Sequence, residues 1–271
     1  MKEQHTADGT AQEQFGDRGI AGRSHGAILD AAEAWPRRVA ASRRASPRAA
    51  RHDATVHPPA SSLRAPGPRP PLAPEDARTV ARDADARAAI LVEGWSDQAA
   101  VDALARRQHR DLAAERVVVV PIGGATNVER FVRVLGPHGL GLRLAGLYDV
   151  AELQHVRRAL AHAGIGDGHA TIERVAALGF FACDADLEDE LIRALGTAAV
   201  ERVVDAEGEL ASFRRFQQQP AQRGRQPVAQ LRRFLGTRAG RKIRYGTLLV
   251  DALDLDRVPP ALEGVLAHVR G

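Results

Sequence analysis

Acidic residues gather after three apolar segments of this chain, at the points where buried strands are expected to end. These residues are Glu93, Asp97, Asp149, Glu152, Asp186 and Glu188. In a parallel sheet the carboxyl ends of the strands meet at one edge, so these side chains are expected to lie close together. Clustered carboxylates raise one another's pKa unless a cation neutralises them, and Mg²⁺ prefers such oxygen ligands. The pattern predicts a divalent-metal site suited to phosphoryl transfer, in which two ions could clamp the attacking and leaving oxygens.

A purely structural explanation competes for part of this pattern. Asp or Glu at the start of a helix caps it or complements its dipole. Asp184 and Asp189 suit that explanation, because both fall near the start of an expected helix. Glu93 does not suit it, since it stands directly after a buried strand.

Four strand and helix units must position the acids. Continuous apolar runs predict buried strands at 88–92, 117–120, 142–148 and 178–183. Each run is followed by helical spacing, at 97–110, 127–135, 151–163 and 187–195. The series predicts an α/β fold with a mainly parallel four-stranded sheet covered on both faces.

The segments before and after the α/β domain differ from it in composition. Residues 1–84 are rich in Ala, Arg and Pro and predict a disordered, low-complexity leader, or a basic arm that tethers DNA; a short helix at 27–41 is compatible with either. The α/β domain is expected over 85–196. Residues 197–271 predict a basic helical extension packed on it, with helices at 198–204, 226–235, 241–253 and 260–269.

Charge is segregated along the chain. Residues 91–210 carry 19 Asp and Glu against 12 Lys and Arg, whereas residues 211–250 carry ten Lys and Arg and no acid. An acidic cleft beside a basic strip suits a phosphate-backbone ligand, although arginines at helical spacing also make an ordinary solvated face. The nucleic-acid contacts predicted from this strip are Arg232, Arg233, Arg241 and Arg244.

Several classes of protein are excluded or disfavoured. A single cysteine, Cys183, rules out an intramolecular disulfide and a zinc site of several thiolates. No apolar run approaches about 20 residues and the N-terminus lacks a secretory signal, so a soluble, cytoplasmic protein with no membrane contact is expected. No G-x-x-x-x-G-K-[ST] motif is present, so no ATPase motor is encoded. The net charge of +4 permits a nucleic-acid partner without requiring one.

Gly123 and Gly124, which follow the second expected strand, make either a phosphate nest or a tight turn.

The motifs resemble a known family. The segment Leu91-Val92-Glu93-Gly94-Trp95-Ser96-Asp97 resembles the opening signature of TOPRIM domains, in the form found in nucleases of the OLD (overcoming lysogenization defect) family. The segments 121–127 and 186–189 resemble the corresponding later motifs of that family. The resemblance covers roughly residues 86 to 200, and its strength lies in the ordered series of motifs after successive strands.

The resemblance implies a Rossmann-like TOPRIM fold, bound Mg²⁺ or Mn²⁺, and nicking or cleavage of DNA. Glu93 matches the TOPRIM glutamate, as metal ligand or general acid/base, and Asp149 matches the first aspartate of Asp-x-Asp. Asp186 and Glu188 match acids that serve a second metal. Lys242 is the candidate for the catalytic lysine, with Arg241 and Arg244 as alternatives.

The chain departs from the family in two places. The second aspartate of Asp-x-Asp is replaced by Ala151, so either Glu152 reaches the same metal or the site is crippled. The ATPase of OLD proteins is missing, which predicts a standalone DNA endonuclease. Any ATPase that works with it would be encoded separately. The alternative is a weak or inactive TOPRIM module that binds DNA and a partner ATPase. Topoisomerase or primase activity fits worst, because Tyr148 and Tyr245 are the only tyrosines and no template-binding module is evident.

Overall fold

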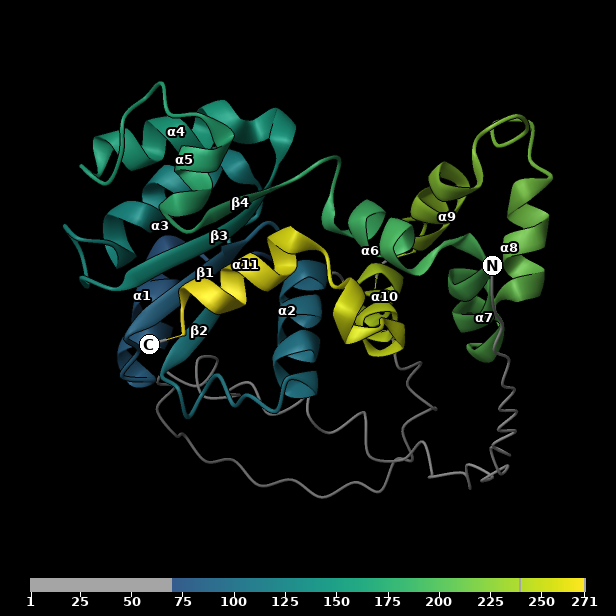
Figure 1. The fold of residues 1–271 in the computed structure, drawn as a ribbon, viewed down its shortest axis with the longest axis horizontal. Helices are drawn as coiled ribbons and strands as arrows, with labels where there is room; N and C mark the ends of the chain where they lie inside the picture. Colours follow the sequence, from purple (N-terminus) through teal and green to yellow (C-terminus); the bar gives the residue numbers. More distant parts are fainter. Residues whose placement is uncertain (1–69, 239, 271) are drawn as a thin grey trace, which may run out of the picture. The chain divides into compact units, whose positions relative to one another are not determined.

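A four-stranded parallel sheet forms the core of the α/β domain. The computed structural model describes residues 70–238 and 240–270 (Figure 1). The strands are β1 (Ala88–Val92), β2 (Val117–Pro121), β3 (Arg143–Asp149) and β4 (Phe180–Cys183), in the order β2-β1-β3-β4. All the pairings are parallel. The predicted α/β fold with a parallel four-stranded sheet is therefore confirmed.

Strand composition explains why this sheet is covered on both faces. All five residues of β1 are buried, as are all five of β2, so neither strand presents a side chain to water. The register pairs Val92 with Pro121 and Asp149 with Cys183, which aligns the carboxyl ends of the strands along one edge. This edge is where the predicted acids emerge.

Helices cover the two faces of the sheet (Figure 1). Helices α1, α3 and α4 pack together on one face, and α2 and α11 pack on the other, while α5 contacts β4. Their bounds are α1 (Pro74–Asp83), α2 (Trp95–Arg107), α3 (Val128–Leu135), α4 (Leu153–His162), α5 (Ile172–Ala177), α6 (Leu187–Leu195) and α11 (Pro260–His268). None of the described helices is both long enough and apolar enough to cross a membrane.

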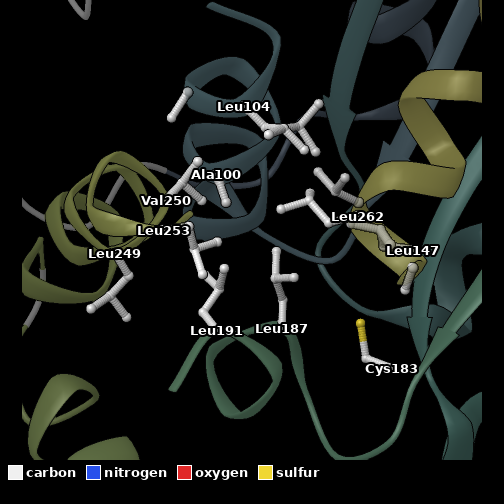
Figure 2. Packing of buried hydrophobic residues seen from close by; sticks show 14 of the residues in the cluster. Ala100, Leu104, Leu147, Cys183, Leu187, Leu191, Leu249, Val250, Leu253 and Leu262 are labelled. Atoms are coloured by element: carbon white, nitrogen blue, oxygen red, sulfur yellow. The ribbon is translucent and has the colours of Figure 1, made fainter. Parts of the chain in front are cut away.

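The C-terminal helices share the core of the α/β domain. They are α7 (Thr197–Ala206), α8 (Leu210–Gln217), α9 (Pro227–Leu235), α10 (Arg241–Ala252) and α11. Helix α10 packs along α2, and α11 returns to β3 and β4. One buried cluster runs from Leu147 and Leu262 through Leu104 and Leu187 to Val250 (Figure 2). The predicted packing of this extension on the α/β core is confirmed, and it holds the start of α10 near the acidic edge.

Residues 74–83 correct one expectation. The composition predicts that they belong to the disordered leader, but they form α1, which buries Ala77, Val80 and Ala81 against α3 and β2. Pro74 opens the helix, and acids in its first turn complement the helix dipole. These features outweigh the proline-rich composition just before them. The rest of the leader, including the helix expected at 27–41, lies outside the described residues.

Gly246 allows α10 to approach α2 closely. A Cβ atom at Gly246 would lie 2.5 Å from the carbonyl oxygen of Ser96 in α2. We expect Gly246→Ala to lower the free energy of unfolding by about 1–3 kcal/mol, because the backbones must separate. Urea denaturation measures this effect, with Gly236→Ala as the control, since a Cβ there would meet its nearest atom at 3.6 Å. Equal stability of Gly246→Ala and the parent protein would contradict this account of the α2–α10 contact.

Candidate active site

Five of the six predicted acids line one pocket at the carboxyl edge of the sheet. The pocket is lined by Glu93, Asp97, Asp149, Asp186, Glu188 and Lys242, with walls of Leu147, Tyr148, Cys183 and Leu187. The acids lie just after β1, in α2, at the end of β3 and at the start of α6, and the lysine lies in α10. Residues from distant parts of the sequence therefore lie together at the carboxyl ends of the strands, where the sequence predicts the acids.

The strand ends and α2 fix three of the carboxylates. Glu93 directly follows β1, and its side chain is exposed. Asp97 lies in the first turn of α2 and is buried, and its Oδ2 accepts a hydrogen bond of 2.8 Å from the backbone N–H of Gly94. Asp149 is the last residue of β3 and is partly buried. The capping bond explains why Asp97 stays fixed in spite of its burial.

Helix α6 supplies the other two carboxylates, each paired with a cation. Asp186 caps α6 by accepting a bond of 2.8 Å from the N–H of Asp189, and its Oδ2 lies 2.6 Å from Nε of Arg232. Glu188 is 3% exposed, and its Oε2 lies 3.1 Å from Nζ of Lys242. The basic C-terminal helices α9 and α10 thus close the acidic pocket from one side.

The remaining acids lie outside the pocket. Glu152 belongs to the 3₁₀ helix η3 (Val150–Glu152), and its Oε2 lies 3.4 Å from Nε2 of His155. Asp184 and Asp189 both form ion pairs with Arg193, at 3.3 and 2.7 Å. Asp184 and Asp189 are therefore ion-pair partners of Arg193, and the residue whose side chain caps α6 is Asp186.

The pocket carries more negative than positive charge. Burial and the Glu188 carboxylate raise the pKa of Asp97 to about 7. Burial, with Glu93 and Asp186 nearby, raises the pKa of Asp149 to about 7. Burial also raises the pKa of Glu188, even though Lys242 opposes the shift. Two cations do not neutralise five carboxylates, so an additional cation would be favoured here.

The chemistry of the pocket fits a divalent metal. Its donors are carboxylate oxygens, which hard cations prefer. The Oε2 atom of Glu188 is buried and has no hydrogen-bond partner among the described residues, so only its ion pair with Lys242 compensates its charge. Across residues 70–238 and 240–270, no three acid, histidine or cysteine side chains are gathered as a ready metal cage. Lys242 and Arg232 hold Glu188 and Asp186, so these ion pairs would rearrange when a metal binds.

The glycine loop anchors the end of β1. The N–H of Gly123 donates a bond of 2.9 Å to the carbonyl oxygen of Glu93, and Nδ2 of Asn127 donates to the Ile122 and Gly123 carbonyls. Gly123 and Gly124 have φ of 74° and 110°, where side chains are strained. The segment is a tight turn that supports the backbone of Glu93, and phosphate binding by this loop stays a prediction.

The predicted nucleic-acid contacts divide into two groups. Arg241 is buried: its Nη2 lies 3.0 Å from Oε1 of Glu209, and its Nη1 donates to the Phe234 carbonyl. Arg244 is ion-paired with Glu207 and Glu209. These two arginines hold the C-terminal helices together, whereas Arg232 and Arg233 are exposed beside the acidic pocket. Sequence reasoning missed Arg225, which lies close to them, because its charge stands in a loop before α9.

Asp97→Asn is expected to stabilise the metal-free protein at pH 8. The unfolded chain ionises Asp97 near its ordinary pKa of 3.8, but the folded protein does so near 7, so stability is lost as pH rises between these values. Asparagine removes that loss and retains the capping acceptor, and we expect a gain of about 1–3 kcal/mol at pH 8 that disappears near pH 4. Urea denaturation in EDTA at both pH values measures it, with the exposed Asp83→Asn as control. A gain that is the same at both pH values would contradict the shifted ionisation.

Comparisons with known proteins agree with this geometry. The family model of the overcoming lysogenization defect protein-like TOPRIM domain matches residues 86–150. The C-terminal region of the Burkholderia pseudomallei OLD protein aligns with a TM-score of 0.54 and 22% identity, over 68% of this chain and 97% of its own. The C-terminal region of the Xanthomonas campestris pv. campestris OLD protein aligns with a TM-score of 0.54 and 25% identity, over 69% of this chain and 93% of its own.

No curated protein matches this chain. The matched residues 86–150 contain β1, β2 and β3 and end just after Asp149, so they include the strand-end acids Glu93 and Asp149. Residues 86–150 match the model of an OLD-like TOPRIM domain, and the fold of the chain resembles the C-terminal regions of OLD proteins.

Proposed function

We propose that this protein is a metal-dependent DNA endonuclease that cleaves a phosphodiester bond at the acidic pocket. The observation that carries the proposal is the meeting of five carboxylates and one lysine at the carboxyl edge of an OLD-like TOPRIM domain. Carboxylates alone would repel a nucleic acid, but carboxylates that hold a divalent ion attract its phosphates. A TOPRIM domain of the OLD type is a nuclease-type module, which gives the pocket its expected substrate.

The carboxylates of Asp97, Asp149, Asp186 and Glu188 would hold Mg²⁺ or Mn²⁺, and Glu93 is a further candidate ligand. When bound, the ion would neutralise the pocket and polarise the phosphate that undergoes cleavage. In the reaction, water attacks phosphorus, one P–O ester bond breaks, and the leaving oxygen takes up a proton. Glu93 is exposed at the pocket, so its carboxyl group can also exchange a proton with water or substrate.

Lys242 would stabilise the negative charge that develops on the phosphate. Its burial disfavours the charged form, but the neighbouring Glu188 and Asp97 carboxylates outweigh this effect and raise the pKa of Lys242. The ammonium group therefore stays charged at neutral pH. A fixed positive charge beside a reacting phosphate lowers the activation barrier.

One observation favours a second candidate function. Ala151 offers no oxygen where the family pattern has an aspartate, and Glu152 pairs with His155 outside the pocket. The β3 end of the pocket is thus left with Asp149 alone. This deficit favours a weak or inactive TOPRIM module that binds DNA and a partner ATPase.

Cleavage of end-labelled oligonucleotides distinguishes the two candidates. Single-stranded and duplex oligonucleotides are incubated with the protein in Mg²⁺, Mn²⁺ or EDTA and separated on denaturing gels. An endonuclease gives internal fragments that require metal. Binding without fragments in any metal would support the second candidate, and co-purification with an ATPase would then identify its partner.

A further inference from the structure

An open groove adjoins the acidic pocket on the side of α9. Its lining residues are Asp186, Glu188, Arg225, Ala229, Arg232, Arg233, Gly236 and Lys242. Three of them, Asp186, Glu188 and Lys242, also line the acidic pocket. Pocket and groove are therefore continuous, and a ligand centred on the acids extends along α9.

One face of α9 builds the wall of this groove. Ala229, the pair Arg232 and Arg233, and Gly236 recur at helical spacing, so they share the exposed side of the helix. The opposite side, with Leu231, Phe234 and Leu235, is buried. The small residues at 229 and 236 leave the groove open over two helical turns, about 10 Å. The arginines stand between them.

The groove carries positive charge that no acid offsets along its outer part. Arg225 and Arg233 form no ion pair with any described acid, whereas Arg232 and Lys242 pair with Asp186 and Glu188 at the pocket end. Elsewhere in the basic segment the arginines at 214, 241 and 244 are held by glutamates. The charge at Arg225 and Arg233 thus remains available to a ligand.

The chemistry of the lining indicates the class of ligand. Guanidinium groups bind phosphate in bidentate fashion. None of the lining residues is aromatic, so the groove offers no platform on which bases could stack. A ligand that fits is a phosphodiester backbone read for its charge, without regard to base sequence.

We propose that this groove binds the backbone phosphates that flank the phosphate in the acidic pocket, with Arg225 and Arg233 as the principal contacts. This proposal rests on the proposed function, because it assumes that the reacting phosphate lies in the acidic pocket and that the neighbouring phosphates lie in the groove. It replaces the contacts expected from Arg241 and Arg244, which are engaged within the protein. Arg225 and Arg233 are positioning residues, because they lie away from the reacting atoms.

Equilibrium binding tests the groove independently of cleavage. Fluorescence anisotropy of a labelled oligonucleotide is measured in Mg²⁺ over about 50–200 mM salt for Arg225→Ala/Arg233→Ala, with Glu93→Gln added to every protein compared so that cleavage is suppressed. The control, Arg215→Ala/Arg238→Ala, removes two exposed arginines that line a separate hollow between α8 and α9. Both double variants change the net charge equally, so only the position of the lost charge differs.

The groove variant should bind at least about tenfold more weakly at the lower salt concentration, and its slope of log K against log[salt] should be shallower by about 1–2. The control should keep a slope close to that of the parent protein, and two oligonucleotides of unrelated sequence should behave alike. An unchanged slope for the groove variant, or an equal loss of affinity in the control, would contradict phosphate binding by the groove. If the groove variant binds DNA more weakly but the parent protein cleaves no DNA, phosphate binding in the groove is supported and the nuclease function is contradicted. If the parent protein cleaves DNA but the groove variant binds it as well as the parent does, the nuclease function is supported and phosphate binding in the groove is contradicted.

Discussion

Glu93→Gln is expected to lower metal-dependent DNA cleavage by about 10²–10⁴-fold without lowering stability. The Glu93 side chain is exposed and makes no hydrogen bond or ion pair with the described residues, so glutamine keeps its shape and loses only its charge. Whether Glu93 binds metal or moves a proton, both roles need the carboxylate. Initial cleavage rates and thermal unfolding of the purified variant measure the two effects separately.

Glu152→Gln is the matched control for this prediction. Glu152 is also an acid that closely follows a strand of the sheet, but it pairs with His155 and does not line the pocket. We expect little change in cleavage rate from this substitution. A Glu93→Gln protein that cleaves as fast as the parent, or an equal loss in Glu152→Gln, would show that the active site lies elsewhere.

Lys242→Met is expected to lower cleavage by about 10²–10³-fold, because it removes the cation beside the reacting phosphate. It should also lower the free energy of unfolding by about 1–2 kcal/mol, since buried Glu188 loses its partner while the lysine itself is half exposed. Single-turnover cleavage and urea denaturation measure these losses. The additional change Glu188→Gln should restore stability without restoring cleavage.

Arg244→Met is the control for the lysine. Arg244 lies on the same helix, is similarly exposed, and pairs with Glu207 and Glu209 away from the pocket. Its loss should cost stability but not cleavage. If Arg244→Met reduced cleavage as much as Lys242→Met, the lysine would not be the group that stabilises the reacting phosphate.

Much of the sheet could be predicted because its strands are continuous apolar runs. All five residues of β1 are apolar, so neither face of the strand suits contact with water and the sequence predicts a buried strand. Helices α5 and α8 were not predicted. Helix α5 has six residues and one fully buried side chain, which gives no periodic pattern. Helix α8 buries Phe213 and Phe216, three residues apart, and that spacing is a signal that could have found it.

The acids of the site could be predicted because parallel strands bring their ends together whatever the rest of the chain does. The roles of the basic residues could not. Arg241 and Arg233 look alike in sequence, yet Arg241 is buried over the Phe234 ring and bound to Glu209, while Arg233 faces the groove. A count of charges along residues 211–250 cannot show that acids from residues 186–209 fold back to neutralise part of them.

Nicking of supercoiled plasmid by the parent protein and by Glu93→Gln, purified in parallel, tests whether the acidic pocket cleaves DNA. Each protein is incubated with Mg²⁺, Mn²⁺ or EDTA. We expect that the parent nicks the plasmid only with metal and that Glu93→Gln fails to do so at equal folding and DNA binding. Metal-dependent nicking that persists in Glu93→Gln, or DNA binding by the parent without nicking in either metal, would contradict this expectation.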